Sequence, residues 1–267
     1  MGFIERKHSL SVQFEYGAER LTTGPDLERF DGVLPNNEVH VWRADLPFDL
    51  NFATSLLPLL DPDEQGRAAR FKVQAPRVQF VASHTFLRLA LARYLQIEPA
   101  GVRYRIGANG KPELAGAENI RFNLSHTEGA AALVIARDLA VGIDVERIRD
   151  NVEILDLAAR FFSSTEADWL RSQPASEQLG AFFSCWTAKE ALLKAYGTGF
   201  STSLADFTAI PKPGQGRVEL DIHNDQLPRN WSIWQLDLGP DLRAAVAVVG
   251  VDVTIRCGNW QWPSWIP

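Results

Sequence analysis

The distribution of apolar and polar residues along the chain predicts a series of strands and helices. Residues 38–44, EVHVWRA, alternate apolar and polar side chains as a half-buried strand does. Beyond residue 201 the chain is again rich in strand-forming segments, whereas the charged and turn-rich residues 1–37 predict a loosely ordered segment. Four short apolar segments predict further strands: VRYRI at 102–106, IRFNL at 120–124, AAALVIA at 130–136 and AVGIDVE at 140–146.

Helices are indicated by residues that commonly begin and end them. Asp61 can cap a helix that starts at Pro62, and Ser163 and Glu166 have the spacing of a capping box. Gly197 is a usual residue just beyond a helix C-terminus. The sequence therefore predicts helices in DPDEQGRAARF, at about 78–95, at about 152–159, in STEADWLRS and at about 177–196.

Two segments of the chain resemble each other. AALVIARDLAVGIDV at 131–145 is similar to AAVAVVGVDV at 244–253. A duplicated α/β unit would explain this similarity, and so would chance, because short Ala/Val strands are common. With a duplication, the chain is an α/β (α+β) protein of two similar subdomains, residues 38–150 and 151–267. Repetition at the periods of solenoid proteins is absent from the sequence.

Composition and charge narrow the class of protein. The chain has 27 Lys and Arg against 33 Asp and Glu, a net charge of −6, which does not favour a general nucleic-acid binder. Cys185 and Cys257 are far apart and have no metal-ligand spacing. The start, MGFIERKHSL, lacks an apolar signal region, and no apolar run approaches the ~20 residues that cross a bilayer. These features predict a cytoplasmic protein with reduced cysteines, bound neither to membrane nor to nucleic acid.

Acidic residues at three positions could form a metal site. Asp144 and Glu146 share one face of the predicted strand VGIDVER, where two carboxylates repel unless a cation lies between them. Glu190 and Lys194 lie four residues apart on the longest predicted helix. They could form an exposed ion pair worth a few tenths of a kcal/mol. Alternatively, Glu190 completes a three-carboxylate site of the kind that suits Mg²⁺.

Other polar groups could bind an anion. Asn123, Ser125 and His126 lie at the end of a predicted strand. The segment GANGKPEL is either an Asn-Gly turn with a solvated Lys111 or a loop whose backbone approaches a phosphate that Lys111 neutralises. Together with the carboxylates, these groups describe a pocket for a polyphosphate ester. Basic residues also gather upstream, at Arg67, Arg70, Lys72 and Arg77.

Four motifs in a fixed order resemble one known family. NGKP, FNLSH, VGIDVE and FFSCWTAKEALLKAYGTG closely resemble the Sfp-type 4′-phosphopantetheinyl transferases, and the similarity spans about 61–201. The resemblance implies a pseudo-twofold pair of α/β subdomains that is active as a monomer. It also implies an enzyme of the holo-[acyl-carrier-protein] synthase type, which transfers the 4′-phosphopantetheine arm of coenzyme A to a serine of an acyl or peptidyl carrier protein.

The resemblance also implies roles for individual residues. Asp144 and Glu190 would bind Mg²⁺ with the pyrophosphate of coenzyme A, and Glu146 matches a third ligand of many bacterial members. Lys194 would contact the pyrophosphate and stabilise the leaving group, adenosine 3′,5′-bisphosphate, and Glu190 is the candidate base. Asp144, Glu190 and Lys194 are thus the expected catalytic set. The residues expected to bind coenzyme A are Arg67, Asn109, Gly110, Lys111, Asn123, Ser125, His126, Lys189 and Lys194.

Two other functions and several carriers stay open at this point. A magnesium-dependent phosphodiesterase or nuclease could use the same carboxylates, and a non-catalytic protein could bind coenzyme A without turnover. Carriers of fatty-acid, polyketide, peptide-synthetase and lysine pathways all fit. At the C-terminus, Trp260, Trp262 and Trp265 either fold back on the body of the protein or form a patch that binds a partner.

Overall fold

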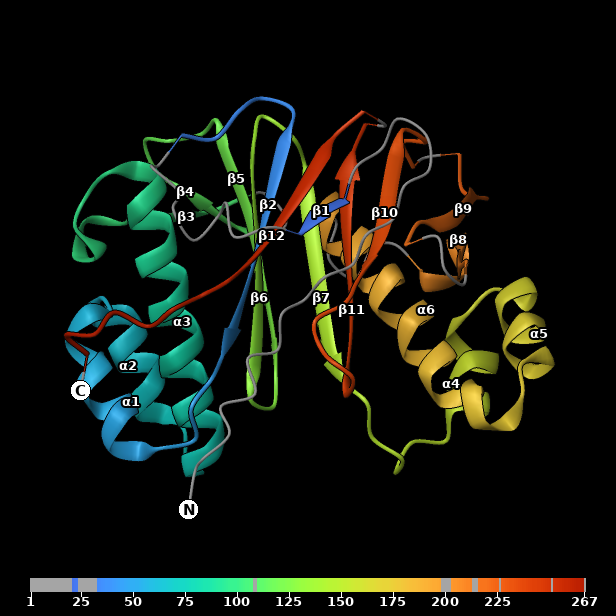
Figure 1. Cartoon of the computed structure of the whole chain (residues 1–267), viewed down its shortest axis with the longest axis horizontal. Helices are drawn as coiled ribbons and strands as arrows, with labels where there is room; N and C mark the ends of the chain where they lie inside the picture. Colours follow the sequence, from blue (N-terminus) through green and yellow to red (C-terminus); the bar gives the residue numbers. More distant parts are fainter. Residues whose placement is uncertain are drawn as a thin grey trace, which may run out of the picture.

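Each half of the chain runs through the same series of elements in the computed structural model (Figure 1). The structure describes residues 21–23, 33–107, 110–197, 203–212, 216–225, 227–250 and 252–266. The first series is β2 (Glu38–Asp45), α1 (Leu50–Leu56), α2 (Pro62–Arg70), α3 (Gln74–Leu95), β3 (Tyr104–Ile106), β4 (Pro112–Leu114), β5 (Ile120–Thr127) and β6 (Ala130–Arg137).

The second half repeats this order of one strand, three helices, a two-stranded hairpin and two long strands. Its elements are β7 (Val141–Arg147), α4 (Ile154–Phe161), α5 (Ser164–Ser172), α6 (Ala175–Tyr196), β8 (Phe207–Pro211), β9 (Val218–Ile222), β10 (Trp231–Leu236) and β11 (Leu242–Val249). Outside the two series lie β1 (Leu21–Thr23) and β12 (Thr254–Asn259), and short 3₁₀ helices cover Leu57–Leu59, Pro99–Gly101 and Leu204–Asp206.

The long strands form two sheets with matching connections. One sheet has the order β1-β12-β2-β6-β5 and the other the order β10-β11-β7. In each half the first strand pairs antiparallel with the last, β2 with β6 and β7 with β11. The two halves are therefore similar α/β units, as the sequence predicts. They also share a strand, because β12 follows the second series but pairs in parallel with β2 of the first.

Helices cover the outer faces of the two sheets, and the inner faces pack on each other (Figure 1). In β6 the side chains of Ala132, Val134 and Ala136 meet the second sheet, while Leu133 and Ile135 pack under the helices. Both faces of β6 are buried, and this explains its continuous apolar run in place of strict alternation. Among the described residues, no helix is both long and apolar enough to cross a membrane.

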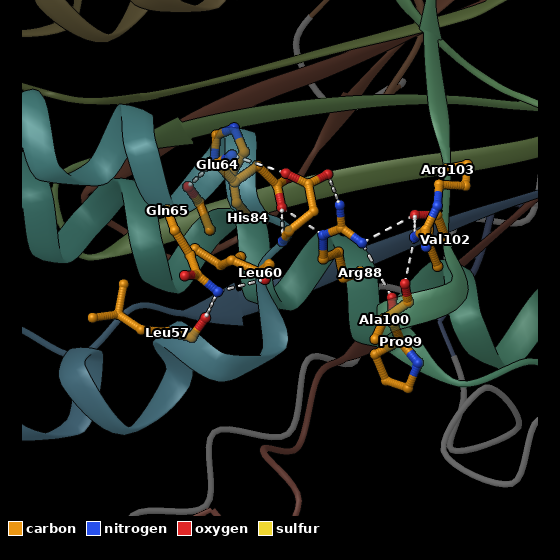
Figure 2. A network of polar contacts seen from close by, with 12 residues as sticks. Leu57, Leu60, Glu64, Gln65, His84, Arg88, Pro99, Ala100, Val102 and Arg103 are labelled. Atoms are coloured by element: carbon orange, nitrogen blue, oxygen red, sulfur yellow. Dashed lines mark hydrogen bonds and ion pairs between the residues drawn. The ribbon is translucent and has the colours of Figure 1, made fainter.

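One buried ion pair recurs at equivalent positions in the two halves. In α2, Glu64 forms a capping box with Asp61. Its Oε2 also accepts a hydrogen bond from Nε of Arg88 in α3, at 2.5 Å (Figure 2). In α5, Glu166 closes a capping box with Ser163 and receives the ammonium of Lys189 from α6, at 2.5 and 2.7 Å. Arg88 and Lys189 are each the fifteenth residue of a 22-residue helix. This correspondence supports a duplicated unit independently of the strand order.

The sequence signals for helix ends are confirmed, with some shifts in the bounds. Pro62 is the first residue of α2 after the Asp61 cap, and Gly197 ends α6 with a φ of +67°. Helix α3 begins at Gln74, before the expected 78, because Pro76 is tolerated in the first turn of a helix. Helix α1 has no counterpart in the sequence-based prediction.

The structure describes the C-terminal tail but only part of the N-terminal segment. The C-terminal tail folds back on the first half, where Trp260 packs edge-on against Trp42 and Trp262 donates its Nε1–H to the carbonyl of Asp45 at 3.0 Å. Of the expected loose segment at 1–37, residues 1–20 and 24–32 lie outside the described residues. The division at residue 150 stays a prediction.

Candidate functional site

The two sheets meet where β5, an edge strand of the first, lies beside β7, an edge strand of the second. Side chains of β5 accept the backbone N–H groups along this edge of β7, at alternate positions in both strands. The pairs are Ile143 to Asn123 at 2.9 Å, Val145 to Ser125 at 3.3 Å and Arg147 to Thr127 at 3.2 Å. We call these three β5 residues the seam. They bind edge N–H groups of β7 that have no strand partner on this side.

Asp144 of β7 lies beside Ser125, the middle residue of the seam, and is only 4% exposed. Its Oδ1 accepts a hydrogen bond from Ser125 Oγ at 2.9 Å and another from Lys194 Nζ at 2.6 Å. Its Oδ2 is buried and has no hydrogen-bond partner among the described residues. A buried carboxylate oxygen without a partner costs free energy, and a bound ligand that contacts this oxygen would remove that cost.

Glu146 and Glu190 lie within electrostatic reach of Asp144. Burial raises the pKa of Glu190, and the charge of Asp144 raises it further while Lys194 lowers it. Burial and Asp144 likewise raise the pKa of Glu146, and Glu190 adds to this effect. The structure therefore brings the three predicted carboxylates together, with Lys194 among them.

The donor set fits a hard cation, but the structure does not define a metal site. Three carboxylates supply the oxygen ligands that Mg²⁺ prefers. In the part of the chain that the structure describes, no group of three or more His, Cys, Asp or Glu residues is arranged to hold a metal ion. The magnesium site of Asp144, Glu146 and Glu190 therefore stays a prediction, supported by the unpartnered Oδ2 of Asp144.

Close backbone packing at Gly142 places α6 across β7. A Cβ atom on Gly142 would lie 2.2 Å from the carbonyl oxygen of Ala191 and 2.4 Å from the amide nitrogen of Ala195. Real Cβ atoms do not approach backbone so closely, so only glycine fits at this position. The contact lies within the helix segment that carries Glu190 and Lys194, and it sets how far these side chains stand from Asp144.

Gly142→Ala is expected to destabilise the protein by about 3 kcal/mol or more, because strand and helix backbones must separate to admit the methyl group. Urea unfolding should show a lower midpoint with an unchanged slope. Gly180→Ala in α6 is the control, since its Cβ would meet only the far end of the Arg243 side chain, at 3.1 Å. An unchanged midpoint in Gly142→Ala would contradict the close contact.

Nitrogen-bearing side chains of the first half extend the site away from the carboxylates. Gln79 Nε2 donates to His126 Nδ1 at 3.1 Å, and burial and the charge of Lys194 lower the pKa of His126. The ring of His84 stacks on Phe80 with centroids 3.9 Å apart. Burial, then the charge of Arg67, lowers the pKa of His84 to about 4. Sequence reasoning missed Gln79 and His84, because α3 is buried on most sides and its polar residues form no motif.

The remaining predicted residues differ in how they relate to this site. Gly110 adopts the left-handed conformation of a turn, with a φ of +80°, and Asn109 lies outside the described residues. The Lys111 ammonium donates to two backbone carbonyls, and burial lowers its pKa to about 8. The Lys189 ammonium is bound away from the three predicted metal ligands. Lys189 is fully buried, and its ammonium is bound by Glu166 and by the Phe207 carbonyl at 2.6 Å.

Comparisons with known proteins agree with this arrangement. The model of the 4′-phosphopantetheinyl transferase superfamily matches residues 140–253, which include Asp144, Glu146, Glu190 and Lys194. The 4′-phosphopantetheinyl transferase HetI of Nostoc sp. is 33% identical over 236 residues, 87% of this chain and 94% of that protein.

Two further relatives carry the same description. A putative 4′-phosphopantetheinyl transferase of Synechocystis sp. is 30% identical over 174 residues, 64% of this chain and 69% of that protein. The 4′-phosphopantetheinyl transferase Sfp of Bacillus subtilis is 24% identical over 203 residues, 76% of this chain and 89% of that protein. With a relative one-third identical over nearly its whole length, and with a family model that matches the carboxylate segment, the chain belongs to the 4′-phosphopantetheinyl transferase superfamily.

Proposed function

We propose that this transferase is of the holo-[acyl-carrier-protein] synthase type, with coenzyme A as donor and an acyl or peptidyl carrier protein as acceptor. The serine oxygen of the carrier would bond to the phosphorus that bears the pantetheine arm. The phosphoanhydride bond of the pyrophosphate would break, and adenosine 3′,5′-bisphosphate would leave. The observation that carries this proposal is the buried Asp144, hydrogen-bonded to Lys194 on one oxygen and unpartnered on the other.

Asp144, Glu146 and Glu190 would hold a Mg²⁺ ion. When bound, Mg²⁺ neutralises charge on pyrophosphate oxygens and so favours displacement at phosphorus. The fit rests on the donor chemistry of the three carboxylates and on the free, buried Oδ2 of Asp144. Ser125 supports this role, because its hydroxyl and Lys194 fix the other oxygen of Asp144 in place.

Lys194 would act on the leaving group and Glu190 on the attacking serine. The Lys194 ammonium, 2.6 Å from Asp144 Oδ1, would stabilise negative charge on the departing bisphosphate. Glu190 would take the proton of the carrier serine, directly or through a water. Burial raises the pKa of Glu190, whereas a bound Mg²⁺ would lower it, so the proposed base role rests on the place of Glu190 beside Asp144 and Lys194.

The groups of the first half would bind the nucleotide end of coenzyme A. Arg67 and His126 suit the 3′-phosphate, with Gln79 holding the His126 ring. The turn at Gly110 would offer backbone to the ligand. A monomeric enzyme, a cytoplasmic location and the absence of nucleic-acid partners stay predictions.

An apo carrier protein incubated with this chain, coenzyme A and Mg²⁺ is expected to gain the mass of one phosphopantetheine. Intact mass spectrometry of carriers from several pathways would detect the change, and chelation of the metal should stop it. The same carrier with its acceptor serine replaced by alanine is the control. Carriers of unchanged mass together with uncleaved coenzyme A would overturn the proposal. Cleavage of coenzyme A without a carrier would instead indicate a hydrolase.

A further inference from the structure

Lys111 reaches from the first half of the molecule into the second. It stands just before β4, where its carbonyl accepts the Gly107 N–H at 2.9 Å. Its ammonium donates to the carbonyl of Val141, the first residue of β7, at 2.8 Å. The same ammonium donates to the backbone carbonyl of Lys194 in the last turn of α6, also at 2.8 Å. One side chain thus joins three elements.

The carbonyl of Lys194 is one that the helix cannot satisfy by itself. The last four carbonyls of an α-helix lack a helical N–H partner, and the Gly197 N–H is used by the carbonyl of Leu193 at 3.0 Å. The C-terminus of a helix also carries partial negative charge, which a cation stabilises. Lys111 therefore provides both a donor and a positive charge at the end of α6.

These contacts act on the residues proposed for chemistry. Lys111 holds the backbone of Lys194, whose side chain contacts Asp144. Its other carbonyl partner lies next to Gly142, where strand and helix backbones touch. Because both bonds converge on one ammonium, they fix the last turn of α6 against the start of β7. The seam then fixes the rest of β7 against β5.

We propose that Lys111 is a positioning residue, which places Lys194 and Glu190 relative to Asp144 by fastening the end of α6 to β7, rather than a ligand of a phosphate group. The proposal rests on the function proposed for Lys194 and Glu190. It differs from the interpretation drawn from the sequence, in which the charge of Lys111 neutralises a phosphate of coenzyme A.

Lys111→Met retains most of the side-chain length and removes the three N–H donors. We expect kcat to fall about 10-fold or more, because small displacements of catalytic groups slow the chemical step. KM for coenzyme A should stay within about twofold. Lys111→Arg restores donors and charge and should recover most of the lost kcat. A phosphate ligand gives the opposite result, in which KM rises and kcat at saturation is unchanged, and this outcome would overturn the proposal.

Ser232→Ala is the matched control, because it removes a hydrogen bond of a buried side chain, to the carbonyl of Gly250 at 2.7 Å, from a strand, β10, that carries none of the proposed site residues. Its kcat should stay within about twofold of the starting protein, as for a change remote from the chemistry. An equal loss of kcat in Ser232→Ala and Lys111→Met would indicate general loosening and would count against Lys111.

Amide hydrogen exchange provides a readout that does not depend on activity. In Lys111→Met, amides at the end of α6 and the start of β7 should exchange about 10-fold faster, while those of α3 stay unchanged. Faster exchange in a protein that modifies no carrier would support the fastening role and reject the proposed function. Unchanged exchange together with unchanged kcat would reject the fastening role alone.

Discussion

Asp144→Asn is expected to lower kcat by about 10²-fold or more, the scale of loss when a group that stabilises transition-state charge is removed. Asparagine has nearly the same shape, and its carbonyl can still accept from Ser125 and Lys194. The negative charge is lost, and an NH₂ group replaces an oxygen. The variant should therefore fold normally while losing both the ligand for Mg²⁺ and the partner charge of Lys194.

Asp252→Asn tests the same tetrapeptide pattern outside the site. GIDV at 142–145 and GVDV at 250–253 look alike, but Asp252 is exposed and precedes β12, whereas Asp144 is buried within β7. The kcat of Asp252→Asn should stay within about threefold of that of the starting protein, as for most surface substitutions. Circular dichroism must first show that both variants fold. Equal losses of kcat would refute the placement of the catalytic carboxylate in the first of the two segments.

Lys189→Met is expected to destabilise the protein by about 3–5 kcal/mol, because it leaves the carboxylate of Glu166 buried without a counter-charge. Both side chains are fully buried, and burial lowers the pKa of Lys189 although the Glu166 charge opposes this shift. Urea unfolding would report the loss as a lower midpoint. Steady-state kinetics of the folded variant test the sequence-based prediction that Lys189 binds coenzyme A, since KM for coenzyme A would then rise.

Two further variants distinguish the loss of an ion pair from a loss of packing. Lys189→Met combined with Glu166→Gln should recover part of the stability, because no buried charge is left over. Recovery stays partial because Glu166 also accepts the N–H groups of Ala209 and Ser163, at 2.6 and 2.8 Å. Arg88→Met in the first half should cost a similar amount. A Lys189→Met variant as stable as the starting protein would contradict the importance of the pair.

The elements that sequence reasoning predicted well have local causes. The signals used for α2, α5 and α6 lie within a few residues of the helix ends that they define: the Asp61 cap before Pro62, the capping-box pair Ser163 and Glu166, and Gly197. Helix α1, LNFATSL, was missed although Asp49 caps it, because seven residues are too few to show a helical period and neither a capping box nor a terminal glycine marks its ends.

The candidate site was predictable where side chains contact side chains and less so where they contact backbone. Asp144, Glu146, Glu190 and Lys194 are brought together as their motifs suggest. Lys111 binds carbonyl groups, and a carbonyl has no signature in the sequence. Lys189 shows a second limit: its partner Glu166 is a side chain, but it lies 23 residues away, and only the packing of α5 against α6 brings the two together.

The place of β12 beside β2 bears on the order of events during protein synthesis. Arg256 of β12 pairs with Glu38 of β2, 218 positions earlier in the chain. A ribosome therefore completes the whole first half, and most of the second, before β2 can acquire this neighbour. Until then β2 presents an unpaired, largely apolar edge, a known template for association with other chains. The nascent first half should consequently be prone to aggregation, and chaperones that cover exposed strands should raise the yield of the complete protein.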